Sequence, residues 1–176
     1  MRQDGSVTES DRQDAAGLLG REWIEGWYLP RLSGRVLWVG VNADTPKYQQ
    51  LVRQPERFES IDVSERVASL GSNVRHYVGD FLRHKPSGFY DHIGVYGLDE
   101  KYTPKGEVSW VKWSSKLLKK ADRMLRPGGT ILFGGNVTRD WARLRGIVPI
   151  VLYREKFCRS RWVDGRLVLK WWIEKP

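Results

Sequence analysis

Three positions along the chain have residue types and a spacing suited to binding a ribose-containing ligand. Gly40 ends an apolar run, and a residue without a Cβ lets the backbone turn and pass close to a ligand. Asp62 follows 22 residues later, at the end of a second run, where a carboxylate can accept hydrogen bonds from both hydroxyls of a ribose. Asp80 follows a third run; its carboxylate can accept from an adenine amino group while the backbone of Phe81 reads the ring nitrogen.

Each of these positions also has a purely structural interpretation. Any turn from a strand into a helix can hold one glycine such as Gly40. Asp62 can serve as the N-cap of a following helix, a role compatible with ribose binding, and Asp80 can belong to a polar turn. Between Gly40 and the next helix, Asn42 and Asp44 are the types that best tolerate left-handed backbone.

The elements that must position these residues alternate between strand and helix patterns. We expect a parallel, doubly wound sheet with helices on both faces, because alternating strands and helices build that architecture. Thr45 and Pro46 form an N-cap and first-position pair. The expected strands are 35–41, 58–63, 74–78, 90–96 and 130–134, and the expected helices are 15–29, 46–53, 64–70 and 108–125.

The end of the chain follows a different pattern. Arg126-Pro127-Gly128-Gly129 predicts a sharp turn into the strand 130–134. The β-rich runs 150–162 and 166–173 flank an Asp-Gly turn, which predicts an antiparallel hairpin. Residues 1–14 are polar and predict a flexible tail, so residues 15–176 are expected to form a single domain.

Taken in order, these segments resemble the class I S-adenosylmethionine-dependent methyltransferases. The matching segments are VLWVGVNADT, FESIDVSE, VGDF, FYDHIGVYG and MLRPGGTILFGG, followed by the terminal hairpin, and they span 35–175. The resemblance implies a Rossmann-like, mostly parallel seven-stranded sheet whose last strand is antiparallel. It also implies S-adenosylmethionine as the cofactor.

The resemblance assigns roles to individual positions. The first turn would line the methionine and ribose of the cofactor, Asp62 and Val63 would contact ribose and adenine, Asp80 and Phe81 the adenine edge, and Tyr96 and Gly97 the transferable methyl. The full cofactor-binding set is Gly40, Val41, Asn42, Asp44, Asp62, Val63, Gly79, Asp80, Phe81, Tyr96 and Gly97.

Three departures separate this chain from the usual family pattern. Trp38 stands where the family usually has an acidic residue, and the second and third glycines of the loop are missing. Tyr96-Gly97-Leu98 replaces the Asn/Asp-Pro-Pro-aromatic motif of the enzymes that methylate amino groups in nucleic acids. The first two departures concern the methionine end of the cofactor; the third leaves the acceptor chemistry unassigned.

A sulfonium methyl donor is already activated, so the enzyme needs mainly to position the acceptor, and a general base only when the acceptor is protonated. Tyr102, Asn136 and Arg139 are the expected acceptor-side residues, with Asp99, Glu100 and Asp140 nearby in the sequence. No catalytic residue is assigned. His76, His84 and His92 are not spaced as metal ligands or as a catalytic pair, and the single cysteine, Cys158, argues against a cysteine-rich zinc site.

Two other classes of function use a similar sheet. A nicotinamide dehydrogenase would need the rest of the G-x-G-x-x-G motif after Gly40, and it would not end in an antiparallel hairpin. The alternative is a non-catalytic binding module with a basic surface, which Trp38 and the missing glycines favour.

Charge and hydropathy limit the partners. The net charge is +9, and residues 139–176 hold ten basic and four acidic side chains, a net of +6. This region is either a solvated basic face or a surface that attracts phosphates, with Trp141, Trp162, Trp171 and Trp172 among its basic residues. A small molecule or glycan acceptor is slightly favoured over nucleic acid. We expect a cytoplasmic protein and no membrane partner, because no apolar run approaches the roughly 20 residues of a spanning helix.

Overall fold

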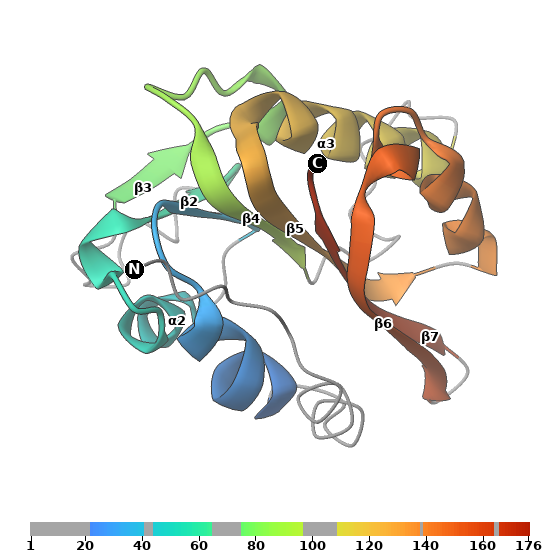
Figure 1. Ribbon diagram of the computed structural model, residues 1–176, viewed down its shortest axis with the longest axis horizontal. Helices are drawn as coiled ribbons and strands as arrows, with labels where there is room; N and C mark the ends of the chain where they lie inside the picture. The colour runs from blue at the N-terminus through green and yellow to red at the C-terminus, as the bar shows by residue number, and fades with distance from the viewer. Residues whose placement is uncertain (1–21, 41–43, 65–74, 97–108, 138, 164–165) are drawn as a thin grey trace.

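The computed structural model describes residues 22–40, 44–64, 75–96, 109–137, 139–163 and 166–176 (Figure 1). Within these ranges seven strands form one sheet in the order β3-β2-β1-β4-β5-β7-β6. The strands are β1 (Val36–Val39), β2 (Phe58–Asp62), β3 (Arg75–Val78), β4 (Tyr90–Tyr96), β5 (Leu125–Val137), β6 (Arg154–Val163) and β7 (Arg166–Glu174).

The first five strands are parallel, and the last two turn the sheet into a mixed one. β1 pairs with β2 on one side and β4 on the other, so the strand order reverses between them. β7 runs antiparallel to both of its neighbours, β5 and β6. This is the expected doubly wound fold with a C-terminal antiparallel hairpin, and the prediction is confirmed.

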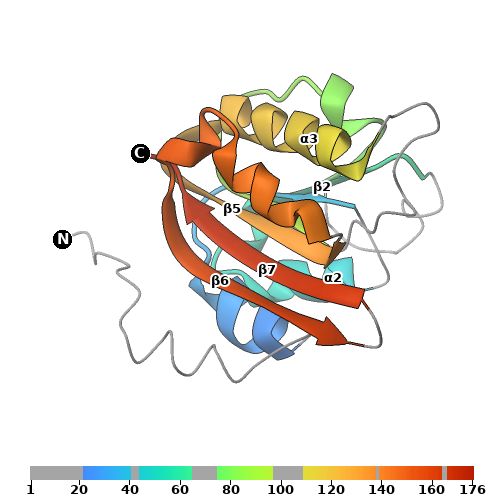
Figure 2. The ribbon, with the colours of Figure 1, turned by 90° about the vertical axis from the view of Figure 1, so that its right-hand side faces the viewer.

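Helical segments cover both faces of the sheet (Figures 1 and 2). One face carries the long helix α3 (Trp110–Met124) with the 3-10 segments η5 (Phe81–Arg83), η7 (Arg139–Gly146) and η8 (Ile150–Leu152). The other face carries the π-helical segment η1 (Trp23–Tyr28), η2 (Leu29–Arg31), α2 (Thr45–Leu51) and η3 (Pro55–Arg57).

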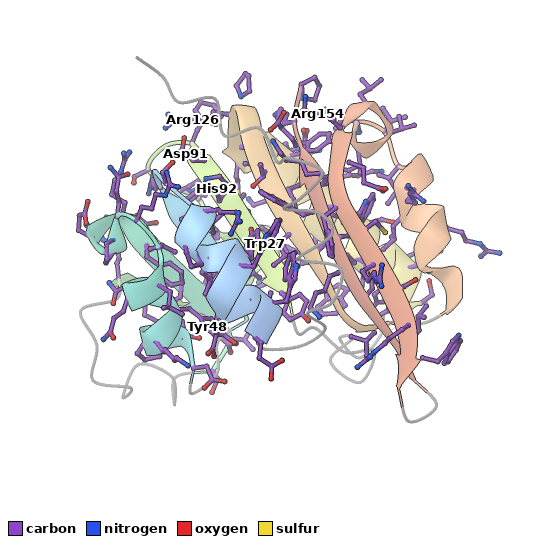
Figure 3. The ribbon with its side chains drawn as sticks, turned by 60° about the horizontal axis from the view of Figure 1, so that its bottom comes forward. Trp27, Tyr48, Asp91, His92, Arg126 and Arg154 are labelled. Atoms are coloured by element: carbon purple, nitrogen blue, oxygen red, sulfur yellow. The ribbon has the colours of Figure 1, made fainter. Side chains whose placement is uncertain are left out.

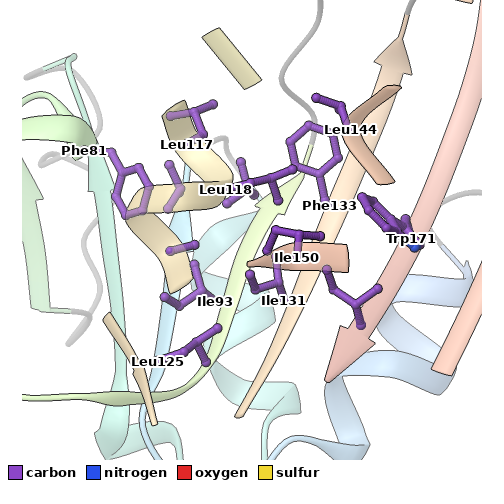
Figure 4. Packing of buried hydrophobic residues seen from close by; sticks show 14 of the residues in the cluster. Phe81, Ile93, Leu117, Leu118, Leu125, Ile131, Phe133, Leu144, Ile150 and Trp171 are labelled. Atoms are coloured by element: carbon purple, nitrogen blue, oxygen red, sulfur yellow. The ribbon is translucent and has the colours of Figure 1, made fainter. Parts of the chain in front are cut away.

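The core on the α3 face is mainly aliphatic (Figure 4). Leu117 and Leu118 of α3 are buried against Ile93 of β4 and Ile131 of β5. Ser109 caps the helix, because its side chain accepts a hydrogen bond from the backbone of Lys112 at 3.2 Å. Apolar residues at helical spacing therefore fix α3 over the centre of the sheet.

The core on the opposite face is mainly aromatic. Trp23 stacks on Phe157 of β6 with 4.9 Å between ring centroids, and Trp27 meets Trp172 of β7 edge-on at 5.5 Å. Offset stacks and edge contacts are the favoured arrangements of such rings. The short segment η1 is thereby anchored to the C-terminal hairpin.

Three local expectations were wrong. The N-cap of α2 is Asp44 and not Thr45, because Thr45 is already the first residue of the helix and is buried there. Residues 126–129 are not a separate turn: β5 begins at Leu125, and the strand passes through them with an irregular register against β4. Residues 150–152 form η8 instead of starting a strand, and β6 begins at Arg154.

Other predicted elements are only partly visible in the described residues. The predicted helix 64–70 lies outside them apart from Ser64, and the predicted helix 15–29 is described only from residue 22. In the part of the chain that the structure describes, we find no helix with the length and hydropathy needed to cross a membrane.

Candidate functional site

The predicted ligand-binding residues line up along the edge of the sheet where the parallel strands end, which we call the carboxyl edge. The backbone N–H of Gly40 donates to the carbonyl of Ile61 at 3.0 Å, and the N–H of Gly79 donates to the carbonyl of Asp62 at 2.7 Å. Gly40 has φ 82°, in the left-handed region that favours glycine. The ends of β1, β2 and β3 are thus joined in one row.

The two carboxylates at this edge hold local turns. One oxygen of Asp62 accepts from the backbone N–H of Ser64 at 2.8 Å, and one oxygen of Asp80 accepts from the N–H of Leu82 at 2.9 Å. Each carboxylate has four lone-pair positions, so a capping bond leaves acceptor capacity for a ligand. The structural and the ligand-binding interpretations of both residues are therefore compatible.

Apolar surface lies next to these carboxylates. Val63, just after β2, is 74% exposed, and Val78, the last residue of the edge strand β3, is 49% exposed. A Cβ built on Gly79 would meet no atom of the described residues within 4 Å. An apolar surface beside a carboxylate and open space is what an adenine ring and its ribose require.

Tyr96 is the last residue of β4, the strand next to β1, and so lies at the same carboxyl edge. It is half-buried against the aromatic core, and this burial raises its pKa, so the phenol stays protonated and can donate a hydrogen bond. Its register partner on β5 is Gly134, whose own partner on β7 is Lys170. Tyr96 and Lys170 thus lie in one row across three strands, with Gly134 between them.

Lys170 is the residue at this edge that sequence reasoning missed. Its side chain is 1% exposed, its amine has no hydrogen-bond partner, and the Nζ lies 5.9 Å from the ring centre of Trp23. Burial, reinforced by Arg161, lowers the pKa of Lys170 to about 8, while Glu22 acts in the opposite direction. Strict alternation along β7 places it on the face of Trp172; the sequence indicates this face but not the burial of the side chain.

Trp38 has a packing role that explains its departure from the family pattern. It is buried on the aromatic face, where its ring meets Tyr48 edge-on at 5.3 Å between centroids. A Cβ on Gly94 of β4 would lie only 2.5 Å from the Trp38 ring. The large ring on β1 therefore occupies the space that the missing side chain on β4 leaves.

Several predicted site residues lie outside the described residues, namely Val41, Asn42, Gly97 and Tyr102. Asn136 and Arg139 are described only as backbone: Asn136 lies on β5 two residues beyond Gly134, and Arg139 begins η7. Asp44 has φ −87°, so the left-handed conformation considered for it is wrong. Its carbonyl instead accepts the N–H of Tyr48 at 3.0 Å, as the first turn of α2 requires.

The three histidines make separate contacts: His76 Nδ1 lies 2.9 Å from Ser60 Oγ, and the ring of His84 lies 4.6 Å from that of Tyr77. His92 Nδ1 lies 2.7 Å from Thr130 Oγ1, and its Nε2 lies 2.9 Å from the carbonyl of Ser33. Burial lowers the pKa of His92 to about 4. His92 lies near the pair formed by Asp91 and Arg126, far along β4 from Tyr96 (Figure 3).

Comparisons with known proteins agree with this geometry. The sequence matches no protein-family model and no curated protein. Solved structures do match: the N-methyltransferase NodS from Bradyrhizobium japonicum WM9 has a TM-score of 0.62 and 16% identity, over 97% of this chain and 99% of that one. Magnesium protoporphyrin IX methyltransferase (ChlM) from Synechocystis PCC 6803, with bound SAM, has a TM-score of 0.63 and 10% identity, over 100% and 86%.

A third structure broadens the set. The ribosomal protein L11 methylase from Lactobacillus delbrueckii subsp. bulgaricus has a TM-score of 0.61 and 14% identity, over 91% of this chain and 83% of that one. The chain therefore has the Rossmann-like fold of class I S-adenosylmethionine-dependent methyltransferases. These three methyltransferases are named for different activities, so the fold does not select an acceptor.

Proposed function

We propose that this protein binds S-adenosylmethionine at the carboxyl edge of β1, β2, β3 and β4 and transfers its methyl group to an acceptor. The observation that supports the proposal most strongly is the row formed by Gly40, Asp62 and Gly79, on a sheet with the strand order and antiparallel β7 of the methyltransferase fold. Ligands of such sheets bind where the strand order reverses, and here that point lies between β1 and β4.

The described residues fit the cofactor. The Asp62 carboxylate suits the ribose hydroxyls, and the exposed Val63 and Val78 suit the flat faces of adenine. Asp80 and the start of η5 suit the polar adenine edge, and Tyr96, at the end of β4, would lie near the methyl that is transferred. When bound, the cofactor supplies an electrophilic methyl on a sulfonium, so the chain needs chiefly to orient the acceptor and exclude water.

The proposal is tested by calorimetric titration of the full chain with S-adenosylmethionine, S-adenosylhomocysteine and NADH. We expect both sulfur compounds to bind and NADH not to bind. Gly40→Val should abolish binding, because a β-branched residue does not tolerate φ 82° and its side chain would enter the cofactor space. NADH binding, or a crystal structure with the cofactor far from Gly40, would refute the proposal.

Gly128→Val is the matched control for this titration. Gly128 has a similar φ of 75°, but it lies near the start of β5, at the opposite edge of the sheet, where its N–H donates to the carbonyl of Lys175. The same backbone strain is therefore introduced away from the proposed site. We expect both variants to lose stability, and only Gly40→Val to lose the cofactor.

The acceptor is proposed only by class. A small molecule or glycan is slightly favoured, and nucleic acid is the alternative, drawn by the basic C-terminal region. In β6, Arg159 and Arg161 are exposed and pair with Lys170 and Val168, so both lie on the aromatic-core face. If the acceptor is a nucleic acid, replacing both residues (Arg159→Glu with Arg161→Glu) should weaken RNA binding and make it less dependent on salt. Cofactor affinity should be retained.

Two further expectations belong with the proposal. Release of S-adenosylhomocysteine with small amines, oligosaccharides and RNA as acceptors would distinguish an enzyme from a non-catalytic module, an alternative that the comparisons do not support. A cytoplasmic location stays a prediction from the sequence.

A further inference from the structure

The outer surface of α3 carries an unbroken basic stripe. The exposed positions of this helix are all basic, namely Lys112, Lys116, Lys119 and Arg123. At about 1.5 Å per residue the stripe extends roughly 16 Å along the helix. The buried positions of α3 face the aliphatic core, so the stripe points away from the sheet.

An exposed apolar turn lies beside this stripe. The segment 147–152 is fixed by Ile150, which is buried, and by Ile147, which packs against the same core (Figure 4). The opposite side of the turn presents Val148, Val151 and Leu152, with 69%, 54% and 67% of their surfaces exposed. Three aliphatic side chains within five residues thus face solvent on one side of a firmly anchored turn.

The stripe and the turn belong to the same layer of the molecule. α3 and the η7–η8 segment run side by side over one face of the sheet (Figures 1 and 2). The Tyr153 hydroxyl, just after η8, donates to Asp122 of α3 at 2.7 Å. This bond ties the turn to the helix, so the basic stripe and the exposed apolar turn lie on neighbouring segments of one layer. We call these two groups of side chains together the basic–apolar face.

Two acidic side chains near this face pair with cations outside the stripe. Asp122 is the one acidic residue of α3, and Lys175 lies 3.2 Å from its carboxylate. Glu155, near the start of β6, pairs with Arg145 at 2.6 Å and accepts the indole N–H of Trp171 at 2.9 Å. These two described carboxylates are therefore satisfied by groups other than Lys112, Lys116, Lys119 and Arg123.

We propose that the basic–apolar face docks the protein peripherally on an anionic lipid bilayer. Basic side chains beside exposed aliphatic ones are the combination that binds such surfaces: the charges are attracted to the headgroups, and the apolar side chains enter the headgroup–acyl boundary. Single-stranded nucleic acid is favoured less, because its bases stack on aromatic rings, whereas the described exposed apolar side chains of this face, Val148, Val151 and Leu152, are aliphatic. The sequence led us to expect no membrane partner, but that expectation concerned only spanning segments.

The test is sedimentation of the full chain with two kinds of vesicle. One is pure phosphatidylcholine, and the other contains about 30% phosphatidylglycerol as the anionic lipid. We expect binding to the anionic vesicles alone, weakening steeply with salt. Each basic side chain near an anionic membrane strengthens binding roughly fivefold, so Lys112→Glu with Lys119→Glu should weaken it by at least about 25-fold. Val151→Asp with Leu152→Asp should weaken it by about tenfold or more.

Matched controls come from the rest of the chain. Arg53→Glu with Arg57→Glu makes the same change in net charge on exposed residues beside α2, on the opposite face of the sheet, and should retain binding. Phe89→Asp changes an apolar residue that is 60% exposed just before β4, away from η8, and should also retain it. Circular dichroism establishes that each variant is folded.

Four results would overturn the proposal. The first is failure of the wild-type chain to bind anionic vesicles at low salt. The second is equal loss of binding in the two charge-reversal pairs, which would show a response to net charge alone. The third is binding of a single-stranded RNA that the lysine pair abolishes and the Val151–Leu152 pair leaves intact. The fourth is a dimer in sedimentation equilibrium that the Val151–Leu152 pair dissociates. None of these results depends on cofactor binding, so the proposed function is tested separately.

Discussion

Asp62 is the residue through which the proposed site is most directly tested. Asp62→Ala should weaken S-adenosylhomocysteine binding by about 1.5–3 kcal/mol, roughly 10- to 100-fold, because the ribose would lose hydrogen bonds to a charged group. Asp62→Asn should weaken it less, since an amide oxygen can still accept the Ser64 N–H that Asp62 accepts at 2.8 Å. Calorimetry measures both affinities. Without ligand the melting temperature of Asp62→Ala should fall by only about 2–4 °C, because the Ser64 N–H loses its capping bond. A folded Asp62→Ala variant of unchanged affinity would remove this residue from the site.

Lys170 and Lys156 are both buried, but only one of them has an acidic partner. Lys156 donates to Glu174, whereas the amine of Lys170 has no hydrogen-bond partner. Lys170→Met should therefore raise the free energy of unfolding at pH 7 by about 1–3 kcal/mol, because a desolvated cation is removed. Lys156→Met should lower it, because Glu174 loses its closest cation.

The pH dependence gives a second measurement on Lys170. Its folded pKa of about 8 lies below its ordinary value of 10.5, so the cost of burying the cation is fully present below pH 8. As the pH rises from 8 to 10.5 the folded chain holds fewer protons than the unfolded chain, and its stability increases. The advantage of Lys170→Met should shrink across this range in urea titrations. A constant advantage would mean that charge burial is not its cause.

At the scale of elements, β1 and β4 pack closely because the large Trp38 ring on β1 lies over Gly94 on β4, which has no side chain. Gly94→Ala should destabilise the sheet by about 1–3 kcal/mol, because its Cβ would lie 2.5 Å from the buried Trp38 ring. Trp38→Leu should also destabilise it, by leaving space unfilled. The double variant should be more stable than the sum of the two losses predicts, and a double-mutant cycle in urea measures this coupling. Strict additivity would contradict the packing explanation of Trp38.

Sequence patterns predicted elements well where a single local signal decides the structure. The buried run of β1, the amphipathic α3 and the Asp-Gly hairpin carry strong signals, and the structure confirms all three. Local signals failed where tertiary contacts decide. Apolar residues 150–152 read as a strand, but Ile150 turns into the core and leaves Val151 and Leu152 outside. Residues 126–129 read as a turn, but Gly128 and Gly129 bond to Lys175 at the far end of the chain.

The candidate site residues that follow from local sequence signals could be predicted, whereas the one whose burial depends on a distant tertiary contact could not. Gly40, Asp62 and Asp80 lie at or just after the ends of β1, β2 and β3, and strand ends of a parallel sheet meet at one edge, so their alignment follows from topology. Lys170 was missed because its burial depends on Trp23, which lies 147 residues away in the sequence. No local pattern reports a contact of that separation.

For the whole molecule, the prediction of one domain over 15–176 with a flexible tail at 1–14 is tested by calorimetry. We expect a single unfolding transition whose calorimetric and van't Hoff enthalpies agree. Removal of residues 1–14 should leave the melting temperature unchanged, because a polar tail buries little apolar surface. A fall of more than about 2–4 °C, which corresponds to roughly 1 kcal/mol at this size, would show that the tail is part of the domain.

The position of β7 sets the order in which the chain can assemble. β7 is made after β6, yet it lies between β6 and β5 and hydrogen-bonds to both. While a ribosome is still adding residues up to 165, β5 therefore exposes an open apolar edge, and β6 has no neighbour to pair with. Exposed strand edges favour association with other chains, so nascent and shortened forms of this protein should depend on chaperones until β7 is inserted.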